Sequence, residues 1–162
     1  MSNTENQIND IHFKQITAET VLEICKMSQT LTKQQQKAVA DNAVSIAQAY
    51  FSKNVWMRAI YKGSEAIGFI MLHIGSDWSD GIDCPGVFLW RFMIAKPFQG
   101  LGYGKKAIEC LLEHLRALGI PELYTSYHLG DASPEGFYKS LGFIPTGEYY
   151  GEEPEVVLRV GL

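Results

Sequence analysis

Three glycines at alternate positions, Gly100, Gly102 and Gly104, stand between an apolar run and an apolar helical pattern. A turn with few side chains that leads into a helix gathers free backbone N–H groups at the positive end of the helix dipole. Such a point is typical of a phosphate-binding site. Glycine-rich turns also occur for structural reasons alone, so the turn by itself leaves both interpretations open.

The spacing of this turn argues against two familiar phosphate-binding loops. A P-loop requires a glycine where this chain has Gln99 and a hydroxyl residue where it has Lys106. A dinucleotide-binding turn requires its third glycine one residue later and an acid at the end of the next strand, whereas Glu122 begins that strand. Neither nucleotide-binding interpretation fits the spacing well.

Two neighbouring segments complete a pattern that resembles a known family. QGLGYG at residues 99–104 is similar to the Gln/Arg-x-x-Gly-x-Gly/Ala pyrophosphate motif of the GNAT superfamily of N-acetyltransferases. FLWRFMI resembles the central strand of that family, and GFYKSLGF resembles its tyrosine-bearing helix. The resemblance covers roughly residues 87–150. LWRFMI, GFYKSLGF and the following TGE look like the bacterial spermine/spermidine acetyltransferase-like branch.

The resemblance implies acetyl-CoA as the cosubstrate, bound mainly by the main chain. In the family, the central strand pairs with the pantetheine arm and the glycine turn holds the pyrophosphate. Asp131 replaces the family's usual asparagine, and an ionised aspartate cannot donate a hydrogen bond, so we expect reduced or rearranged contact there. Lys105 either adds charge at a phosphate or is a solvated lysine of the first helical turn. Carried over by position, the cofactor-binding residues are Phe92, Met93, Ile94, Gln99, Gly100, Leu101, Gly102, Tyr103, Gly104, Lys105 and Asp131.

Tyr138 matches the general acid of the family. A phenol, with a pKa of about 10, is a reasonable proton donor to an alkyl thiolate, whose pKa lies within roughly two units of it. Phe137 and Leu141 are four residues apart and share the buried face of the predicted helix, whereas Tyr138 is turned about 100° from them. The alternative is an aromatic side chain that only packs beside Phe137. The resemblance places the oxyanion donor at a main-chain N–H near Met93.

The acceptor end of the site is less well defined. Polyamine acetyltransferases often carry a carboxylate on the central strand, where this chain has Trp90 and Arg91. Arg91 either binds a substrate carboxylate or pairs with an acid of the protein, and the second interpretation is preferred. Trp78 and three aspartates lie in the loop at residues 75–86 and could contact a substrate or be ordinary turn residues. The candidate substrate residues are Trp78, Trp90 and Arg91. Glu148, Glu152, Glu153 and Glu155 are either cation contacts or part of a solvated hairpin, and the hairpin interpretation is preferred.

These observations favour acetyl transfer to a primary amine of a small, cationic, polyamine-like molecule by direct attack on the thioester. A peptide or protein amine and an amine antibiotic remain alternatives within the same class. A non-catalytic acyl-CoA-binding sensor is an alternative from another class.

The order of elements predicts one mixed α/β domain over residues 1–162, and the resemblance implies a GNAT-like fold, with a central, mostly antiparallel sheet of about seven strands flanked by about four helices. Thr32 and Gln35 resemble a capping box that opens a helix running to Tyr50. Ser133 and Gly142 bracket a short helix. The expected strands are residues 11–16, 56–61, 66–73, 87–94, 123–127, 143–150 and 155–160; the other helices begin near residue 18 and run from the glycine turn to residue 118.

The composition limits the classes of partner and the cellular location that fit this chain. The net charge of −4 argues against nucleic acid, and no apolar run approaches the roughly 20 residues of a membrane span. Three widely spaced cysteines favour the cytoplasm. Cys25 and Cys110 fit small buried thiols, and the loop position of Cys84 leaves it open to exposure. The histidines form no close ligand pair, so no metal is expected. The resemblance leaves a homodimer open.

Overall fold

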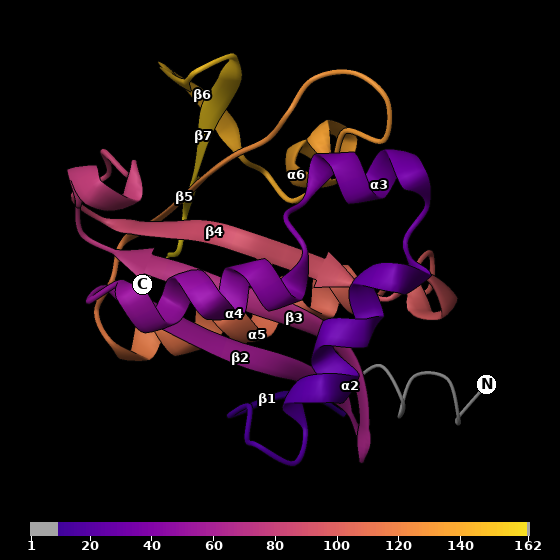
Figure 1. The fold of residues 1–162 in the computed structure, drawn as a ribbon. Helices are drawn as coiled ribbons and strands as arrows, with labels where there is room; N and C mark the ends of the chain where they lie inside the picture. The colour runs from indigo at the N-terminus through magenta and orange to yellow at the C-terminus, as the bar shows by residue number, and fades with distance from the viewer. Residues whose placement is uncertain (1–9, 162) are drawn as a thin grey trace.

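In a computed structural model, which describes residues 10–161, the chain forms one seven-stranded sheet with helices on both faces (Figure 1). The strand order is β1-β2-β3-β4-β5-β7-β6, and within the described residues every neighbouring pair except β4–β5 is antiparallel. The predicted fold class is confirmed. The strands are β1 (Ile11–Lys14), β2 (Val55–Lys62), β3 (Glu65–Ile74), β4 (Val87–Ile94), β5 (Glu122–Ser126), β6 (Ile144–Tyr150) and β7 (Glu153–Arg159).

The helices differ from the expectation at one place. The predicted helix from Thr32 is two helices, because Val39 leaves the helical region with φ −134° and ψ 139°. The capping box at Thr32 is present. Asp41 then caps a new helix, and the buried side chain of Asn42 anchors it by donating to the carbonyl of Ile24 at 2.9 Å. The helices are α2 (Val21–Lys26), α3 (Lys33–Ala38), α4 (Asn42–Phe51), α5 (Tyr103–Ala117) and α6 (Glu135–Ser140), with 3-10 segments η1 (Met27–Thr30), η2 (Trp78–Asp80) and η3 (Lys96–Phe98).

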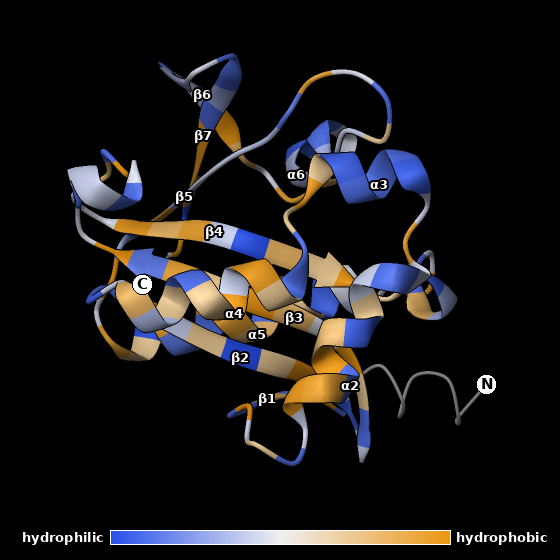
Figure 2. Ribbon diagram, in the orientation of Figure 1, coloured by the Kyte–Doolittle hydropathy of each residue, from blue (hydrophilic) through white to orange (hydrophobic). Residues whose placement is uncertain are grey.

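Each face of the sheet carries its own hydrophobic core. Figure 1 shows α2 and α4 in front of the sheet and α5 behind it. The core under α5 includes Ile108, Leu111 and Leu115 packed on strand residues such as Ile70. A second cluster joins α2 and α4 to the opposite face of the central strands. Figure 2 shows apolar strands inside these layers and a largely hydrophilic α3. Burial of both faces explains why β3 and β4 read as nearly continuous apolar runs.

The parallel pair β4–β5 is short, and this decides where an opening forms. Only Val87, Phe88 and Leu89 of β4 pair with β5. Beyond them β4 continues along β3 alone, while β5 pairs with β7 on its other side. The buried hydroxyl of Thr125 donates to the carbonyl of Leu89 at 2.9 Å and closes the last rung. The two strands therefore separate from residue 90 onward.

A register shift bends β4 at the same point. Met71 of β3 lies opposite Arg91, and the next residue of β3 lies opposite Leu89, so Trp90 has no partner of its own. An extra residue of this kind is a β-bulge, which turns two consecutive side chains toward one face. Here Trp90 packs with the α2–α4 cluster and the guanidinium of Arg91 reaches Gln48 of α4.

The loop at residues 75–86 contains more structure than expected. It includes η2 and an isolated antiparallel bridge between Asp77 and Ile82. Cys84, which its loop position left open to exposure, is buried: only 2% of its surface is exposed, and burial raises the pKa of its thiol to about 11. Within residues 10–161, the model contains no helix that is both long enough and apolar enough to cross a bilayer.

Candidate active site

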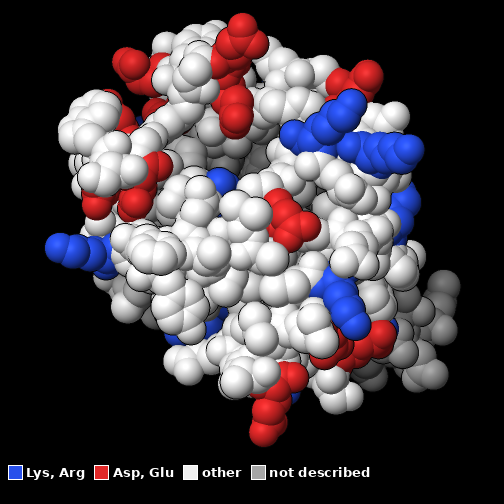
Figure 3. Space-filling model, in the orientation of Figure 1, with Lys and Arg blue, Asp and Glu red and all other residues white. Residues whose placement is uncertain are grey.

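A cavity of about 1070 Å³ occupies the opening between β4 and β5. It runs from the glycine turn before α5, past the separated half of β4, to the start of β7 and the loop before β4. Figure 3 shows the surface hollowed between β4 and the β6–β7 hairpin, with acidic side chains on the rim and basic atoms inside. A space of this size is in the upper range of small-molecule and cofactor sites.

The turn at residues 100–105 presents a row of backbone donors to this cavity. The first amide of α5 with a main-chain partner is that of Lys106, which donates to the carbonyl of Gly102 at 3.1 Å. None of the amides from residue 100 to residue 105 has a hydrogen-bond partner among the described residues. Gly100 and Gly102 have φ of +73° and +88°, a region that disfavours a Cβ, and around Gly100 a Cβ would meet open space. The residues present therefore fit a diphosphate held by peptide N–H groups.

The other predicted cofactor residues divide into those at the cavity and those away from it. Phe92, Met93 and Ile94 line it along the edge of β4 that β5 leaves free. Gln99 does so as well, but its side chain ties the turn together, donating to the carbonyl of Ile94 at 2.8 Å and accepting from Gln35 of α3 at 2.9 Å. The residues of the predicted set that line the cavity are Phe92, Met93, Ile94, Gln99, Gly100, Gly102, Gly104 and Lys105; those that do not are Leu101, Tyr103 and Asp131.

Position alone explains two of these absences. Tyr103 is 4% exposed and packs its ring edge-on against Phe98 inside the protein. Asp131 is exposed, whereas the next three residues, 132–134, border the cavity. The reduced or rearranged cofactor contact expected at Asp131 stays a prediction.

Tyr138 faces the cavity from α6. It is 6% exposed, lies nearly parallel to Tyr127 with ring centroids 5.9 Å apart, and packs edge-on against Phe143. Tyr138 is thus the most buried residue of its helix, whereas Phe137, expected on the buried face, is half-buried. Burial raises the pKa of the Tyr138 phenol, and a hydrogen bond with Thr125 works in the opposite direction. A raised pKa keeps the phenol protonated at neutral pH, which is the form that can donate a proton.

Three charged side chains line the far end of the cavity. Arg91 comes from the bulge of β4, Asp80 from η2 and Glu153 from the start of β7. Within residues 10–161, no carboxylate oxygen lies within 4.0 Å of an Arg91 nitrogen, so the preferred prediction of an ion pair inside the protein is wrong. Glu153 accepts a hydrogen bond from Ser126 at 3.1 Å.

Asp80 is held in place by two groups. Its carboxylate accepts from the hydroxyl of Ser52 at 2.6 Å and lies 2.9 Å from Nε2 of the buried His73. The hydrogen bond from Ser52, followed by that from His73, lowers the pKa of Asp80. Asp80 therefore joins the loop before β4 to α4 and β3, while Glu153 is the less constrained acid.

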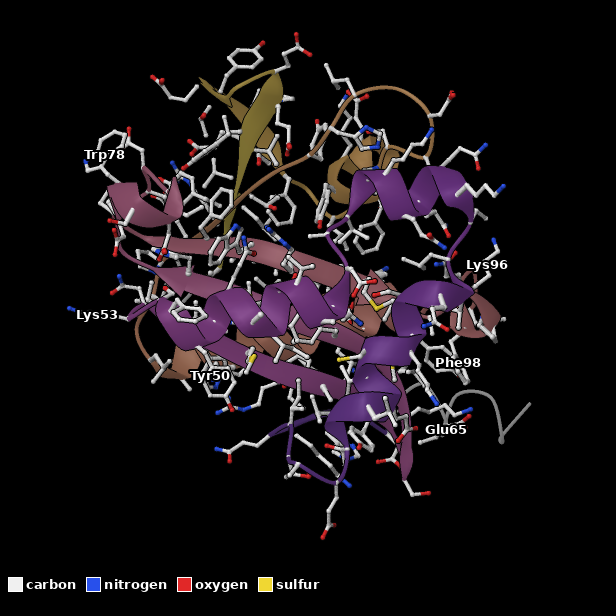
Figure 4. All side chains as sticks on the ribbon, in the orientation of Figure 1. Tyr50, Lys53, Glu65, Trp78, Lys96 and Phe98 are labelled. Carbon is white, nitrogen blue, oxygen red and sulfur yellow. The ribbon has the colours of Figure 1, made fainter. Side chains whose placement is uncertain are left out.

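The structure brings together residues that the sequence pattern did not single out. Thr125, Ser126 and Tyr127 line the cavity at the end of β5, and residues 35–40 line it from α3 and the two residues that follow it. The hydroxyl side chains of Thr125 and Ser126 in the strand were the sequence feature that could have marked it as part of the site. Glu153 is half-buried at the cavity and Glu155 is 7% exposed, so the interpretation of these two as solvated is wrong. Trp78 is 77% exposed, lies outside the cavity lining and stands at the outer edge in Figure 4; its contact with substrate stays a prediction.

Comparison with known proteins agrees with this geometry. The model of the Acetyltransferase (GNAT) family matches residues 24–143, and the chain therefore belongs to the GNAT family of acetyltransferases. The chain is 30% identical over 90 residues to the probable spermine N(1)-acetyltransferase of Bacillus subtilis subsp. natto (strain BEST195), a match that covers 55% of this chain and 59% of the relative. The matched part thus spans less than two thirds of that relative's length.

Two solved structures share the fold. An acetyltransferase from Thermus thermophilus superposes with a TM-score of 0.74 at 15% identity, covering 94% of this chain and 99% of that one. The PaiA N-acetyltransferase from Thermoplasma acidophilum in complex with coenzyme A gives a TM-score of 0.63 at 15% identity, covering 92% and 98%. Within residues 10–161 of the present chain, no group of three or more histidine, cysteine or acidic side chains is placed to hold a metal ion.

Proposed function

We propose that this chain is a single-domain N-acetyltransferase that transfers the acetyl group of acetyl-CoA to a primary amine of a small molecule. The observation that carries the proposal is the row of unpartnered amides at residues 100–105, which opens into the same cavity as the free edge of β4 and Tyr138. The coenzyme A complex of a protein with this fold supports the choice of cofactor. The three unpaired cysteines fit a reducing cytoplasm.

The main chain would bind and orient the cosubstrate. The amides at residues 100–105 would hold the pyrophosphate, with Lys105 adding charge at its edge. The free edge of β4 at Phe92 and Met93 would pair with the pantetheine arm as a short strand would. A main-chain N–H near Met93 is the proposed donor to the carbonyl oxygen as negative charge develops on it. The thioester supplies an activated acetyl group.

The side chains would move the protons. As the amine nitrogen bonds to the acetyl carbon and the carbon–sulfur bond breaks, the phenol of Tyr138 would donate its proton to the departing sulfur. The amine gives up one proton in the same reaction, and Glu153 is the least constrained carboxylate at the cavity to receive it, directly or through water. Burial raises the pKa of Tyr138, and the same dry surroundings would raise the pKa of the thiol it must protonate.

A polyamine-like chain is the first acceptor class to test. The spermine acetyltransferase relative supports it, and so do the acids Asp80 and Glu153 at the far end of the cavity. An acyl-CoA sensor without activity is the second candidate, favoured by the lack of a carboxylate on β4 itself.

The test is thiol release from acetyl-CoA across a panel of small amines, with Tyr138→Phe as the critical variant. We expect its kcat to fall by about 100-fold or more, with coenzyme A affinity retained, because the phenyl ring keeps the packing and removes only the proton. Tyr124→Phe on β5, outside the cavity, is the matched control and should behave as wild type.

Each other result has a definite meaning. An unchanged kcat in Tyr138→Phe would remove the general-acid role. Coenzyme A binding without turnover of any amine would favour the sensor. A failure to bind coenzyme A in calorimetry would reject the site itself.

A further inference from the structure

The bulge in β4 places a cation where a regular strand would bury an apolar residue. Because Trp90 has no partner on β3, Trp90 and Arg91 turn toward the same face of the sheet. Leu89 packs in the core under α5, so without the extra residue regular alternation from Leu89 would aim Arg91 into that same core. The backbone thus accommodates a charged side chain in the middle of a central strand and directs it to the cavity.

The charge of Arg91 has no anionic partner among the described residues. Nη1 donates to the carbonyl of Trp90 at 3.0 Å and Nη2 to the amide oxygen of Gln48 at 3.2 Å, and both acceptors are neutral. Nε is buried without an acceptor. The guanidinium lies 5.0 Å from the centre of the Trp90 ring. Burial lowers the pKa of Arg91, and the negative charge of Glu153 partly offsets this effect.

Of the two acids at this end of the cavity, Asp80 is already bonded to Ser52 and His73, and Glu153 is the less constrained charge. It lies on β7, across the opening from β4, and its carboxylate is beyond the 4.0 Å of an ion pair with Arg91. A cationic site and an anionic site thus face one space without neutralising each other. A ligand that carries both charges satisfies both sites, whereas a purely cationic ligand leaves Arg91 beside a like charge.

We propose that the acceptor carries a carboxylate in addition to its amine, and that Arg91 binds this carboxylate. The acceptor class is then a diamino acid or a similar zwitterionic amine, a polyamine-like chain with an acid attached. The planar guanidinium matches a carboxylate through two parallel N–H donors, which lysine cannot reproduce. This inference rests on the proposed acetyltransfer and specifies its substrate.

Matched pairs of amines test the proposal. Lysine and 1,5-diaminopentane differ only by the carboxylate, as do ornithine and 1,4-diaminobutane. For the wild type we expect kcat/KM to favour the amino acid of each pair by about 10-fold or more. Arg91→Gln should lower kcat/KM for the amino acid by about 30-fold or more, mainly through KM, because a buried charge pair loses one partner. Its kcat/KM for the diamine should not fall.

Two further variants control for charge and folding. Arg91→Lys keeps the positive charge but lacks the two parallel N–H donors of the guanidinium, so it should recover only part of the preference for the amino acid over the diamine. Arg58→Gln is the matched control: Arg58 lies over the ring of Trp56 at 4.6 Å and donates to the carbonyl of Met57 at 2.7 Å, as Arg91 does with Trp90, but it does not line the cavity. If Arg91→Gln does not fold, as judged by thermal melting and coenzyme A binding, Arg91→Lys carries the comparison.

The possible outcomes distinguish a failure of the carboxylate site from a failure of the proposed acetyltransfer. A wild type that prefers the diamine, or an Arg91→Gln variant that loses both members of a pair equally, overturns the carboxylate site while acetyltransfer stands. An enzyme that acetylates no amine at all overturns both.

Discussion

The two halves of β4 differ in what lies beside them. Residues 87–89 pair with β3 on one side and β5 on the other, and all three are buried. Residues 91–94 pair with β3 alone, and residues 90–94 all line the cavity. The first half is apolar throughout, and the second contains the bulge at Trp90 and the charge of Arg91.

This difference shows how one strand can belong both to the core and to the site. A central strand ordinarily commits the backbone groups on both of its edges to its neighbours. Here β5 pairs with β4 over only three residues, so β4 keeps one edge free without becoming an edge strand of the whole sheet. The free edge is therefore rigid, held by β3 and by buried side chains, and rigid elements hold a binding site with little ordering cost.

The largest predicted effect is on coenzyme A affinity, and it comes from the glycine turn that follows residues 90–94 of β4. Gly100→Val places a branched side chain at φ +73°, with roughly 1–3 kcal/mol of backbone strain, and disturbs the row of amides. We expect coenzyme A affinity, measured by calorimetry, to fall by about 100-fold. Gly119→Val at the other end of α5, with the same φ and the same open surroundings, should cost comparable stability and leave affinity unchanged. Equal affinity losses in both variants would show that strain alone is responsible.

A smaller effect, on stability and on coenzyme A binding, is expected from a substitution on β3 beside residues 90–94 of β4. A Cβ at Gly68 on β3 would lie 2.5 Å from the main-chain oxygen of Met93, so Gly68→Ala must displace this part of β4. We expect the free energy of unfolding to fall by about 2 kcal/mol in urea titrations, together with weaker coenzyme A binding. Gly86→Ala, just before the paired half, meets only the ring of Tyr124 at 3.5 Å and should change stability by less than about 0.5 kcal/mol. Similar losses in the two variants would remove the distinction between the halves.

The smallest effect, on the free energy of unfolding, is expected at the Leu89–Thr125 pair, where β4 and β5 separate. Thr125→Val removes the buried hydroxyl that donates to the carbonyl of Leu89 at 2.9 Å. We expect the free energy of unfolding to fall by about 1 kcal/mol, since net values for one such bond are of that order. Thr125→Ser retains the donor, so in the same urea titration it should be more stable than the valine variant. A valine variant as stable as wild type would mean that this hydrogen bond does not hold the strands together.

Local sequence patterns predicted the positions of most helices and strands, but a few bounds and one helix differ in the structure. The strands expected at residues 56–61, 66–73 and 87–94 match β2, β3 and β4 within a residue or two. The predicted helix from Thr32 to Tyr50 failed at Val39 because the spacing of apolar residues cannot show a local break. The helix expected to run to residue 118 ends at Ala117, and Leu118 just past that end is 62% exposed.

The sequence by itself determined the family, the glycine turn and the candidate acid Tyr138, because each depends on residues close together in the chain. Only the tertiary structure decided which residues share the cavity. Arg91, Glu153 and Thr125 are far apart in sequence and meet because β5 leaves β4 after three residues. Whether Arg91 is paired or free is a property of distances between separate strands, and no spacing along one chain segment records it.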